Sequence, residues 1–284
     1  MKKLFIAAFS FCSLLVGAQK LDNSLLWKIS GNGLKQPSYL FGTIHITCDA
    51  TLDQNVLNAL DATSQLYLEL DMDNPGLQME MMGGMMMKDG ITMSSLVSPE
   101  DFALLDKFLL ENTKISAKMM DRFKPFMITS FLLPKMLDCP MESVEMELMK
   151  VSKAQNEETL GLETVQDQLA VFDSIPYEEQ MAELMKTVKD NMAKDKAELN
   201  KMLAMYKAKD LNKLLELMDE SENTMYNQHN DVLLANRNKN WIPKIEAIAK
   251  EKPTFFGVGA AHLGGEDGVI MLLRKKGYKV EAVK

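Results

Sequence analysis

The stretch FFGVGAAHLGG, Phe255–Gly265, decides how the C-terminal part of the chain is interpreted. An apolar, strand-like run breaks into glycines, as the first strand of a dinucleotide-binding fold breaks into its phosphate loop. The dinucleotide fingerprint G-x-G-x-x-G requires glycine at its sixth position, where the helix packs close to the pyrophosphate. Here the sixth position is His262. The stretch therefore predicts a strand followed by a loop that presents a histidine.

A second stretch near the other end of the chain has the same arrangement. In SYLFGTIHIT, an aromatic and aliphatic run leads to Gly42, two further residues and then His45. Glycine allows the backbone to turn or to approach a neighbour closely, so each histidine is expected just beyond a strand end. A single histidine in this context is more often a structural hydrogen-bonding group than a ligand. Because two of the three histidines have this same context, a shared functional site and a structural role are equally favoured.

The first residues, MKKLFIAAFSFCSLLVGAQK, have the pattern of a secretory signal peptide with cleavage near Ala18. Its apolar run is too short for a comfortable membrane span. We therefore expect a periplasmic or secreted protein without stable membrane insertion after the signal is removed. Loss of Lys2 and Lys3 changes the formal charge from −8 to −10. This acidic balance argues against nucleic acid and anionic membranes as partners.

Two cysteines, Cys48 and Cys139, follow the predicted signal peptide. An even pair in an oxidising compartment favours a disulfide bond. Two free, buried thiols are the alternative.

Strand patterns stand at both ends of the chain, and helical patterns stand between them. The sequence therefore predicts an α/β (α+β) fold with a mixed central sheet built from N- and C-terminal segments. After the signal peptide at 1–18, one domain at 19–284 is expected, with a largely helical insertion at about 95–250. The expected strands are at 24–30, 38–45, 64–73, 159–163, 253–260 and 278–283.

Four polar residues follow predicted strands: His45, Glu69, Glu163 and His262. The carboxyl ends of strands are where ligands gather in sheets with helical crossovers. Two imidazoles and two carboxylates suit a divalent transition metal, and they equally suit an acid–base site without metal. The third histidine, His229, is interpreted as structural.

The segment LQMEMMGGMMMKDG, Leu77–Gly90, is rich in methionine. Thioethers bind Cu(I) in exported proteins. Because methionine is abundant throughout the chain, we favour a flexible apolar flap over a copper site.

The order of these motifs resembles the TraB/GumN family (TraB/PrgY/GumN), which is related to the Tiki metal-dependent proteases. YLFGTIHI and GVGAAHLGGEDGVIMLLRKKGYKV resemble the two GxxH motifs, and YLELD, GLETVQDQ and NRNKNW resemble the blocks between them. The resemblance implies a fold shared with erythromycin-esterase-like and ChaN-like proteins. It also implies a Mn, Co or Zn ion, with the metal and catalytic roles divided among His45, His262, Glu69, Glu163 and Arg237. The resemblance to Tiki does not extend to a C-terminal anchor.

The leading hypothesis is an exported metal-dependent hydrolase that acts on a peptide or protein. A bound metal lowers the pKa of its water to about 7, Glu69 or Glu163 takes the proton, and Arg237 stabilises the oxyanion. The alternative is a periplasmic protein that binds a peptide or small ligand without turnover. Metal content separates the two hypotheses.

Overall fold

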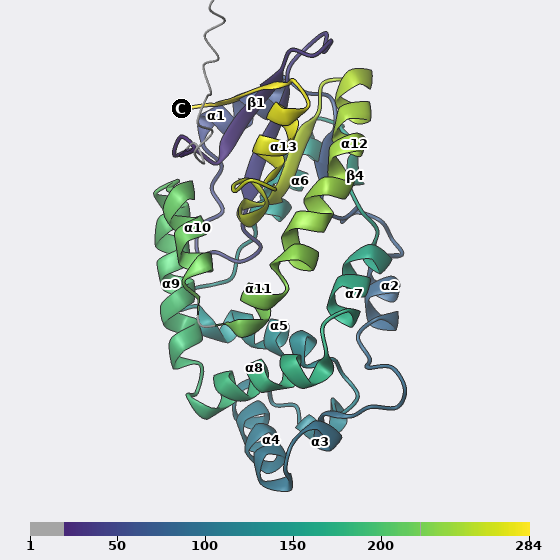
Figure 1. Ribbon diagram of the computed structural model, residues 1–284, viewed down its shortest axis with the longest axis vertical. Helices are drawn as coiled ribbons and strands as arrows, with labels where there is room; N and C mark the ends of the chain where they lie inside the picture. Colours follow the sequence, from purple (N-terminus) through teal and green to yellow (C-terminus); the bar gives the residue numbers. More distant parts are fainter. Residues whose placement is uncertain (1–19, 222) are drawn as a thin grey trace, which may run out of the picture.

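The computed structural model describes residues 20–221 and 223–284, so the predicted signal peptide lies outside the described residues. Within them the strands form one six-stranded sheet in the order β4-β3-β5-β2-β1-β6 (Figure 1). The strands are β1 (Leu26–Ser30), β2 (Ser38–Thr43), β3 (Leu66–Leu68), β4 (Thr159–Gly161), β5 (Phe255–Gly259) and β6 (Lys279–Ala282).

The sheet is mixed, and its parallel part holds the strands that precede the candidate site residues. β2, β5, β3 and β4 run parallel to one another, whereas β1 pairs antiparallel with β2 and with β6. In the β2–β5 pair, Thr43 lies opposite Gly259. The predicted α/β class and the joining of N- and C-terminal segments in one sheet are therefore confirmed.

Helices cover both faces of the sheet because strand side chains alternate between the faces. On β5, Phe256 and Val258 pack with α12 (Asn236–Glu251) and α13 (Val269–Lys275). Phe255 points to the other face and packs with α1 (Gln54–Asp61) and α6 (Val144–Ala154). The result is a three-layer arrangement in which each sheet face has its own apolar core.

A second group of helices lies beyond one end of the sheet (Figure 1). Residues from α4, α5, α8 and α9 build a separate apolar core there. β4 returns to the sheet from within this middle part of the chain, so the stretch 95–250 is helical with one strand inside it. The remaining helices are α2 (Leu77–Gly83), α3 (Met93–Leu96), α4 (Pro99–Thr113), η1 (Ala117–Met119), α5 (Pro125–Met136), α7 (Val165–Asp173), α8 (Tyr177–Lys189), α9 (Ala193–Lys207), α10 (Leu211–Asp219), α11 (Thr224–Gln228), η2 (Asp231–Ala235) and η3 (Ala260–His262).

Several local features follow from residue chemistry. Ser98 caps α4 by accepting from the Asp101 amide, and Pro99 occupies the first turn. α5 contains Pro134 in its last turn and ends two residues later, at Met136. The methionine-rich segment contains the short helix α2, with Met79 and Met82 exposed. The flexible apolar flap stays a prediction.

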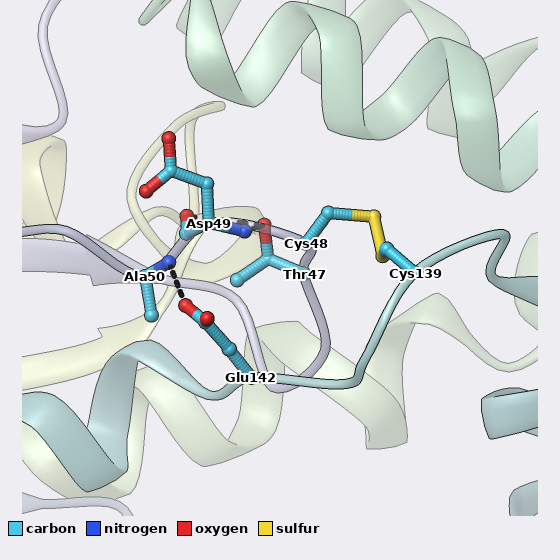
Figure 2. The surroundings of a disulfide bond; sticks show 6 residues. All are labelled: Thr47, Cys48, Asp49, Ala50, Cys139 and Glu142. Carbon is cyan, nitrogen blue, oxygen red and sulfur yellow. Dashed lines mark hydrogen bonds between the residues drawn. A yellow bond between two sulfur atoms is a disulfide. The ribbon is translucent and has the colours of Figure 1, made fainter.

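The predicted bridge between Cys48 and Cys139 is confirmed, with the two α-carbons 5.6 Å apart (Figure 2). It ties the segment after β2 to the segment before α6. Next to it, Thr47 pairs with Glu142 in an isolated β-bridge, and the Ala50 amide donates to the Glu142 carboxylate over 2.8 Å. In the described part of the chain, no helix is long and apolar enough to cross a membrane.

Candidate functional site

The sheet topology brings the four predicted strand-end residues to one edge. Glu69 follows β3 directly, Glu163 lies two residues after β4, and His262 lies three residues after β5. His45 lies two residues after β2, the strand whose Thr43 is paired with Gly259. Because β2, β5, β3 and β4 are parallel, their carboxyl ends meet at this edge. The predicted placement of both histidines at one sheet edge is confirmed.

The glycines of the two GxxH motifs allow the two motifs and Glu69 to approach one another closely. A Cβ atom on Gly42 would lie 2.7 Å from a Leu263 methyl and 3.1 Å from the Ala260 α-carbon. A Cβ atom on Gly259 would lie 3.2 Å from Glu69 Oε1. The first motif therefore packs directly against the second, and the second packs against the carboxylate.

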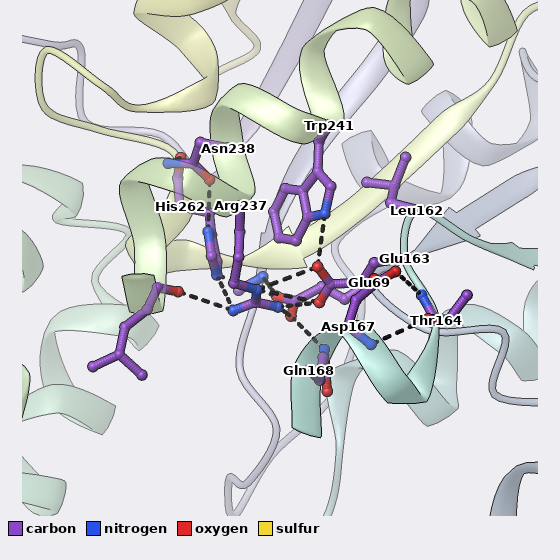
Figure 3. Close-up of polar contacts among 12 residues, drawn as sticks. Glu69, Leu162, Glu163, Thr164, Asp167, Gln168, Arg237, Asn238, Trp241 and His262 are labelled. Atoms are coloured by element: carbon purple, nitrogen blue, oxygen red, sulfur yellow. Dashed lines mark hydrogen bonds and ion pairs between the residues drawn. The ribbon is translucent and has the colours of Figure 1, made fainter. Parts of the chain in front are cut away.

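Arg237 is the centre of the polar cluster (Figure 3). Its Nη2 atom lies 2.5 Å from both Glu69 Oε2 and Glu163 Oε1, and its Nε atom donates to Glu163 over 3.2 Å. Its Nη1 atom lies 3.1 Å from both Leu233 O and His262 Nε2. A guanidinium has five N–H donors, and these partners use them all. Arg237 therefore has no free donor for an oxyanion in this conformation, contrary to the expected role.

One face of α12 supplies three side chains of the site. Besides Arg237, Asn238 accepts from the His262 ring, and the Trp241 indole donates to Glu163 Oε2 over 3.0 Å. The Trp241 ring also packs against the His262 ring, with centroids 4.5 Å apart. The helix is preceded by the π-helical turn η2, and its Leu233 carbonyl accepts from Arg237. Short π-helical segments within α-helices are frequent at functional sites.

The protonation state of His262 follows from its two partners. Arg237 can only donate, so Nε2 of His262 must carry a lone pair. Nδ1 lies 2.6 Å from Asn238 Oδ1 and donates its proton there. Burial, with help from the charge on Arg237, lowers the pKa of His262 to about 4. The ring is therefore neutral near pH 7, and the lone pair of Nε2 accepts from Arg237.

Glu69 lies beside that lone pair. Its Oε1 atom is 3.7 Å from His262 Nε2 and accepts from the Gly259 amide over 2.8 Å. Its Oε2 atom accepts from Arg237 and from Gln168. Burial alone would raise the pKa of Glu69, but the surrounding positive charges and the Gly259 amide lower it to about 2. Glu69 is ionised, and so weak a base is a poor proton acceptor.

His45 stands apart from this network in its contacts. Its Nδ1 atom lies 2.7 Å from Glu145 Oε1, and its side chain is 71% exposed whereas that of Glu145 is 5% exposed. The contact with Glu145 raises the pKa of His45 to about 9, against the opposing effect of desolvation. Glu69 also contributes to this rise, which places His45 within electrostatic range of the cluster.

Sequence reasoning missed Glu145, Asn238, Trp241 and Gln168. Asn238 and Trp241 stand in NRNKNW, and helical spacing places Trp241, four positions after Arg237 and three after Asn238, beside both. Glu145 lies on an amphipathic helix rich in glutamate, and nothing in the sequence distinguishes it from Glu147. The third histidine, His229, pairs with Glu179 of α8 over 2.7 Å, in keeping with its structural interpretation.

The four predicted metal ligands do not form one coordination set. Among residues 20–221 and 223–284, no group of three or more His, Cys, Asp or Glu side chains is arranged to hold a metal ion. The oxygens of Glu163 are engaged by Arg237 and Trp241. His262 and Glu69 do fit a shared ion, because His262 Nε2 and Glu69 Oε1 are 3.7 Å apart. Two zinc ligands at about 2.1 Å from the metal in a tetrahedral site lie roughly 3.4 Å apart.

The fold and site define a class of α/β proteins with paired GxxH histidines and an arginine–carboxylate cluster at one sheet edge. The sequence profile of the TraB/PrgY/gumN family matches residues 25–282, so the chain belongs to this family.

Among curated proteins, the chain is similar to proteins named Metalloprotease TIKI. It is 22% identical to TIKI2 and 21% identical to TIKI1 of Danio rerio, over 93% and 91% of this chain. TIKI2 of Xenopus tropicalis is 22% identical over 91% of this chain. The matches cover only 60–63% of these relatives' length. A search of solved structures found no significant match.

Proposed function

We propose that this protein is an exported metal-dependent hydrolase that cleaves peptide bonds. One observation carries the proposal: His262 Nε2 bears a lone pair and lies 3.7 Å from the ionised Oε1 atom of Glu69. A metal ligand set requires neutral imidazole and deprotonated carboxylate. The surrounding residues hold this pair in those two states before any metal arrives.

The residues around the pair have positioning roles. Asn238 fixes the His262 ring through Nδ1, as the outer partners of metal-bound histidines generally do. Arg237 holds Oε2 of Glu69, which leaves Oε1 directed to His262. Glu163 neutralises Arg237 and is itself fixed by Trp241. We therefore assign Glu163 to the support of Arg237 rather than to the metal.

His45 is the proposed third ligand. It follows the strand next to that of His262, and its charge is felt by both Glu69 and His262. Its exposed ring, brought to the Glu69–His262 pair, would complete a ligand set of two histidines and one carboxylate, which is one of the ligand sets known for catalytic zinc. Metal binding must displace the proton that His45 holds in the metal-free protein.

A metal held by His45, His262 and Glu69 would supply Lewis acidity for a carbonyl group and for water. The protein side chains supply orientation. Because Glu69 and His262 are buried, a substrate carbonyl must approach from the side of His45. Because the donors of Arg237 are occupied, its contribution is to hold Glu69 and Glu163 in fixed positions, which preorganises the site.

The choice of a peptide bond rests on the relatives named metalloproteases. Export rests on the signal-like residues 1–18 and on the Cys48–Cys139 bridge, since disulfides persist in oxidising compartments. The mature protein would begin at Gln19.

The test is hydrolysis by purified mature protein, stripped with a chelator and then supplied with Zn²⁺, Mn²⁺ or Co²⁺. A library of quenched fluorescent peptides reports cleavage. We expect metal-restored cleavage that is lost in Glu69→Gln and His262→Ala and retained in His229→Ala. Peptide binding without cleavage under every metal would favour the alternative, a binding protein without turnover.

A further inference from the structure

Glu145 is a buried carboxylate with two polar neighbours, His45 and Ser143. It lies in the first turn of α6, and its Oε1 atom is 2.7 Å from Nδ1 of His45. Its Oε2 atom accepts from the Ser143 hydroxyl over 2.8 Å. Burying a carboxylate is costly unless it is paired. The ion pair with His45 is the charged contact of this carboxylate, and the Ser143 hydroxyl is its hydrogen-bond donor.

The contact determines which nitrogen of His45 carries a proton. An ionised carboxylate offers lone pairs only, and two lone pairs at 2.7 Å repel each other. Nδ1 must therefore be protonated, and in the neutral ring Nε2 then has the lone pair. His262 has the same arrangement, with Nδ1 bound to Asn238 and Nε2 free of its proton. In both GxxH histidines the lone pair of the neutral ring is therefore on Nε2, and in His262 it accepts from Arg237.

The backbone around this pair is fastened on both sides. The Thr47–Glu142 bridge and the Ala50–Glu142 hydrogen bond join the segment after His45 to the segment before Glu145. The Cys48–Cys139 disulfide closes the same connection (Figure 2). Directly before the two paired residues, the Val144 amide donates to the Ile44 carbonyl over 3.4 Å. The residues directly preceding Glu145 and His45 are therefore held together.

We propose that Glu145 is a positioning residue that holds His45 in the Nδ1–H form and directs Nε2 to the site of Glu69 and His262. The use of Nε2 for a metal rests on the proposed function, whereas the tautomer does not. Glu145 differs from Asn238 in carrying a charge, and a carboxylate partner makes a histidine a stronger ligand. The disulfide serves this pair by keeping α6 beside the first GxxH motif.

The first test reads the tautomer in metal-free protein by long-range ¹H–¹⁵N NMR, at a pH where the His45 ring is neutral. We expect Nδ1–H in the wild type and in Glu147→Gln, a control on the same helix whose exposed carboxylate pairs with Lys150. We expect Nε2–H to become the main form in Glu145→Ala, because nothing then holds the Nδ1 proton. An unchanged Nδ1–H signal in Glu145→Ala would overturn the proposal.

The second test reads Zn²⁺ affinity by competition with a chelator. Loss of an outer carboxylate partner weakens metal binding by roughly 10- to 100-fold. We expect that loss in Glu145→Ala, a smaller loss in Glu145→Gln, and none in Glu147→Gln. Glu145→Gln keeps the size of the side chain and carries the test if the alanine variant does not fold.

The two tests separate this proposal from the metal site itself. If His45→Ala binds Zn²⁺ as the wild type does, the ligand role of His45 is wrong, and the tautomer result still decides the role of Glu145. If His45→Ala loses Zn²⁺ and both Glu145 variants bind it normally, Glu145 has no positioning role.

Discussion

Arg237 donates through Nη1 to Nε2 of His262 over 3.1 Å, in a site where a metal-binding histidine would direct the same nitrogen to its ion. The metal-free site therefore has its lone pair occupied by a guanidinium. The same guanidinium holds Glu69 and Glu163, with Nη2 at 2.5 Å from each. In this arrangement Arg237 organises the carboxylates and keeps the imidazole neutral.

Removal of Arg237 should destabilise the metal-free protein strongly. Arg237→Ala leaves two buried carboxylates without their partner, and breaking a buried pair in this way costs about 3–5 kcal/mol. The measurement is urea unfolding at pH 7. Lys239→Ala is the control, because Lys239 forms an exposed pair with Asp267, and such pairs are worth about 0–1 kcal/mol. Equal, small losses in both variants would show that the cluster is not buried as described.

The two histidines of the candidate site should have widely different pKa values. NMR titration of metal-free protein should give a pKa of about 4 for His262, lowered by burial, and about 9 for His45, raised by Glu145. His45→Ala and His262→Ala assign the signals. If both rings titrate within about one unit of the ordinary value of 6.5, the contacts with Glu145 and Arg237 are not formed in solution.

Acid should destabilise the metal-free protein through the same groups. The pKa of His262 is lower in the folded protein than in the unfolded chain, so the unfolded chain binds its proton first. Stability should therefore fall as the pH falls from about 6.5 to about 4. Glu69 extends the loss below pH 4.5, because its folded pKa is about 2. Urea unfolding across this range should show a flatter dependence above pH 4.5 in His262→Gln; an identical slope contradicts the prediction.

The disulfide should contribute substantially to stability. Cys48 and Cys139 are separated by 91 positions, and in the chain-entropy model a bridge over such a loop stabilises by about 4–5 kcal/mol. Unfolding of a Cys48→Ser, Cys139→Ser double variant measures the loss. Non-reducing peptide mapping of envelope protein should recover the linked pair, and two alkylated thiols there would contradict both the bridge and export.

Export can be checked on the residues that the structure does not describe. Mass spectrometry of protein from its native host should show loss of residues 1–18 and a chain that begins at Gln19. Recovery of the intact chain from the cytoplasm would reject the signal peptide.

The fold was predictable where local pattern and tertiary structure agree. The apolar strands around Phe41 and Phe256 and the two G-x-x-H turns all stand in the sequence in readable form. The positions of Glu69, Glu163 and His262 after strands could be read from the sequence, whereas their convergence follows from the parallel strand order that the structure shows. α5 shows the limit of local signals: Pro134 lacks an amide hydrogen, and the helix nevertheless continues to Met136.

The contacts within the site were not predictable, because they depend on tertiary geometry. Arg237 was expected to face an oxyanion, and only the structure shows that its donors are shared among Glu69, Glu163, His262 and a backbone carbonyl. Glu145 reaches His45 because a disulfide and a bridge bring α6 beside β2. No spacing within the sequence encodes that approach.

The most direct test of the metal site is the metal content of purified mature protein after equilibration with Zn²⁺ and gel filtration. The proposed ligand set predicts about one ion per chain in the wild type and in His229→Ala, and loss of that ion in His262→Ala. His229 is the matched control, because it is paired with Glu179 outside the GxxH motifs. Zinc retained by His262→Ala at the wild-type level, or no zinc in the wild type, would contradict the metal site.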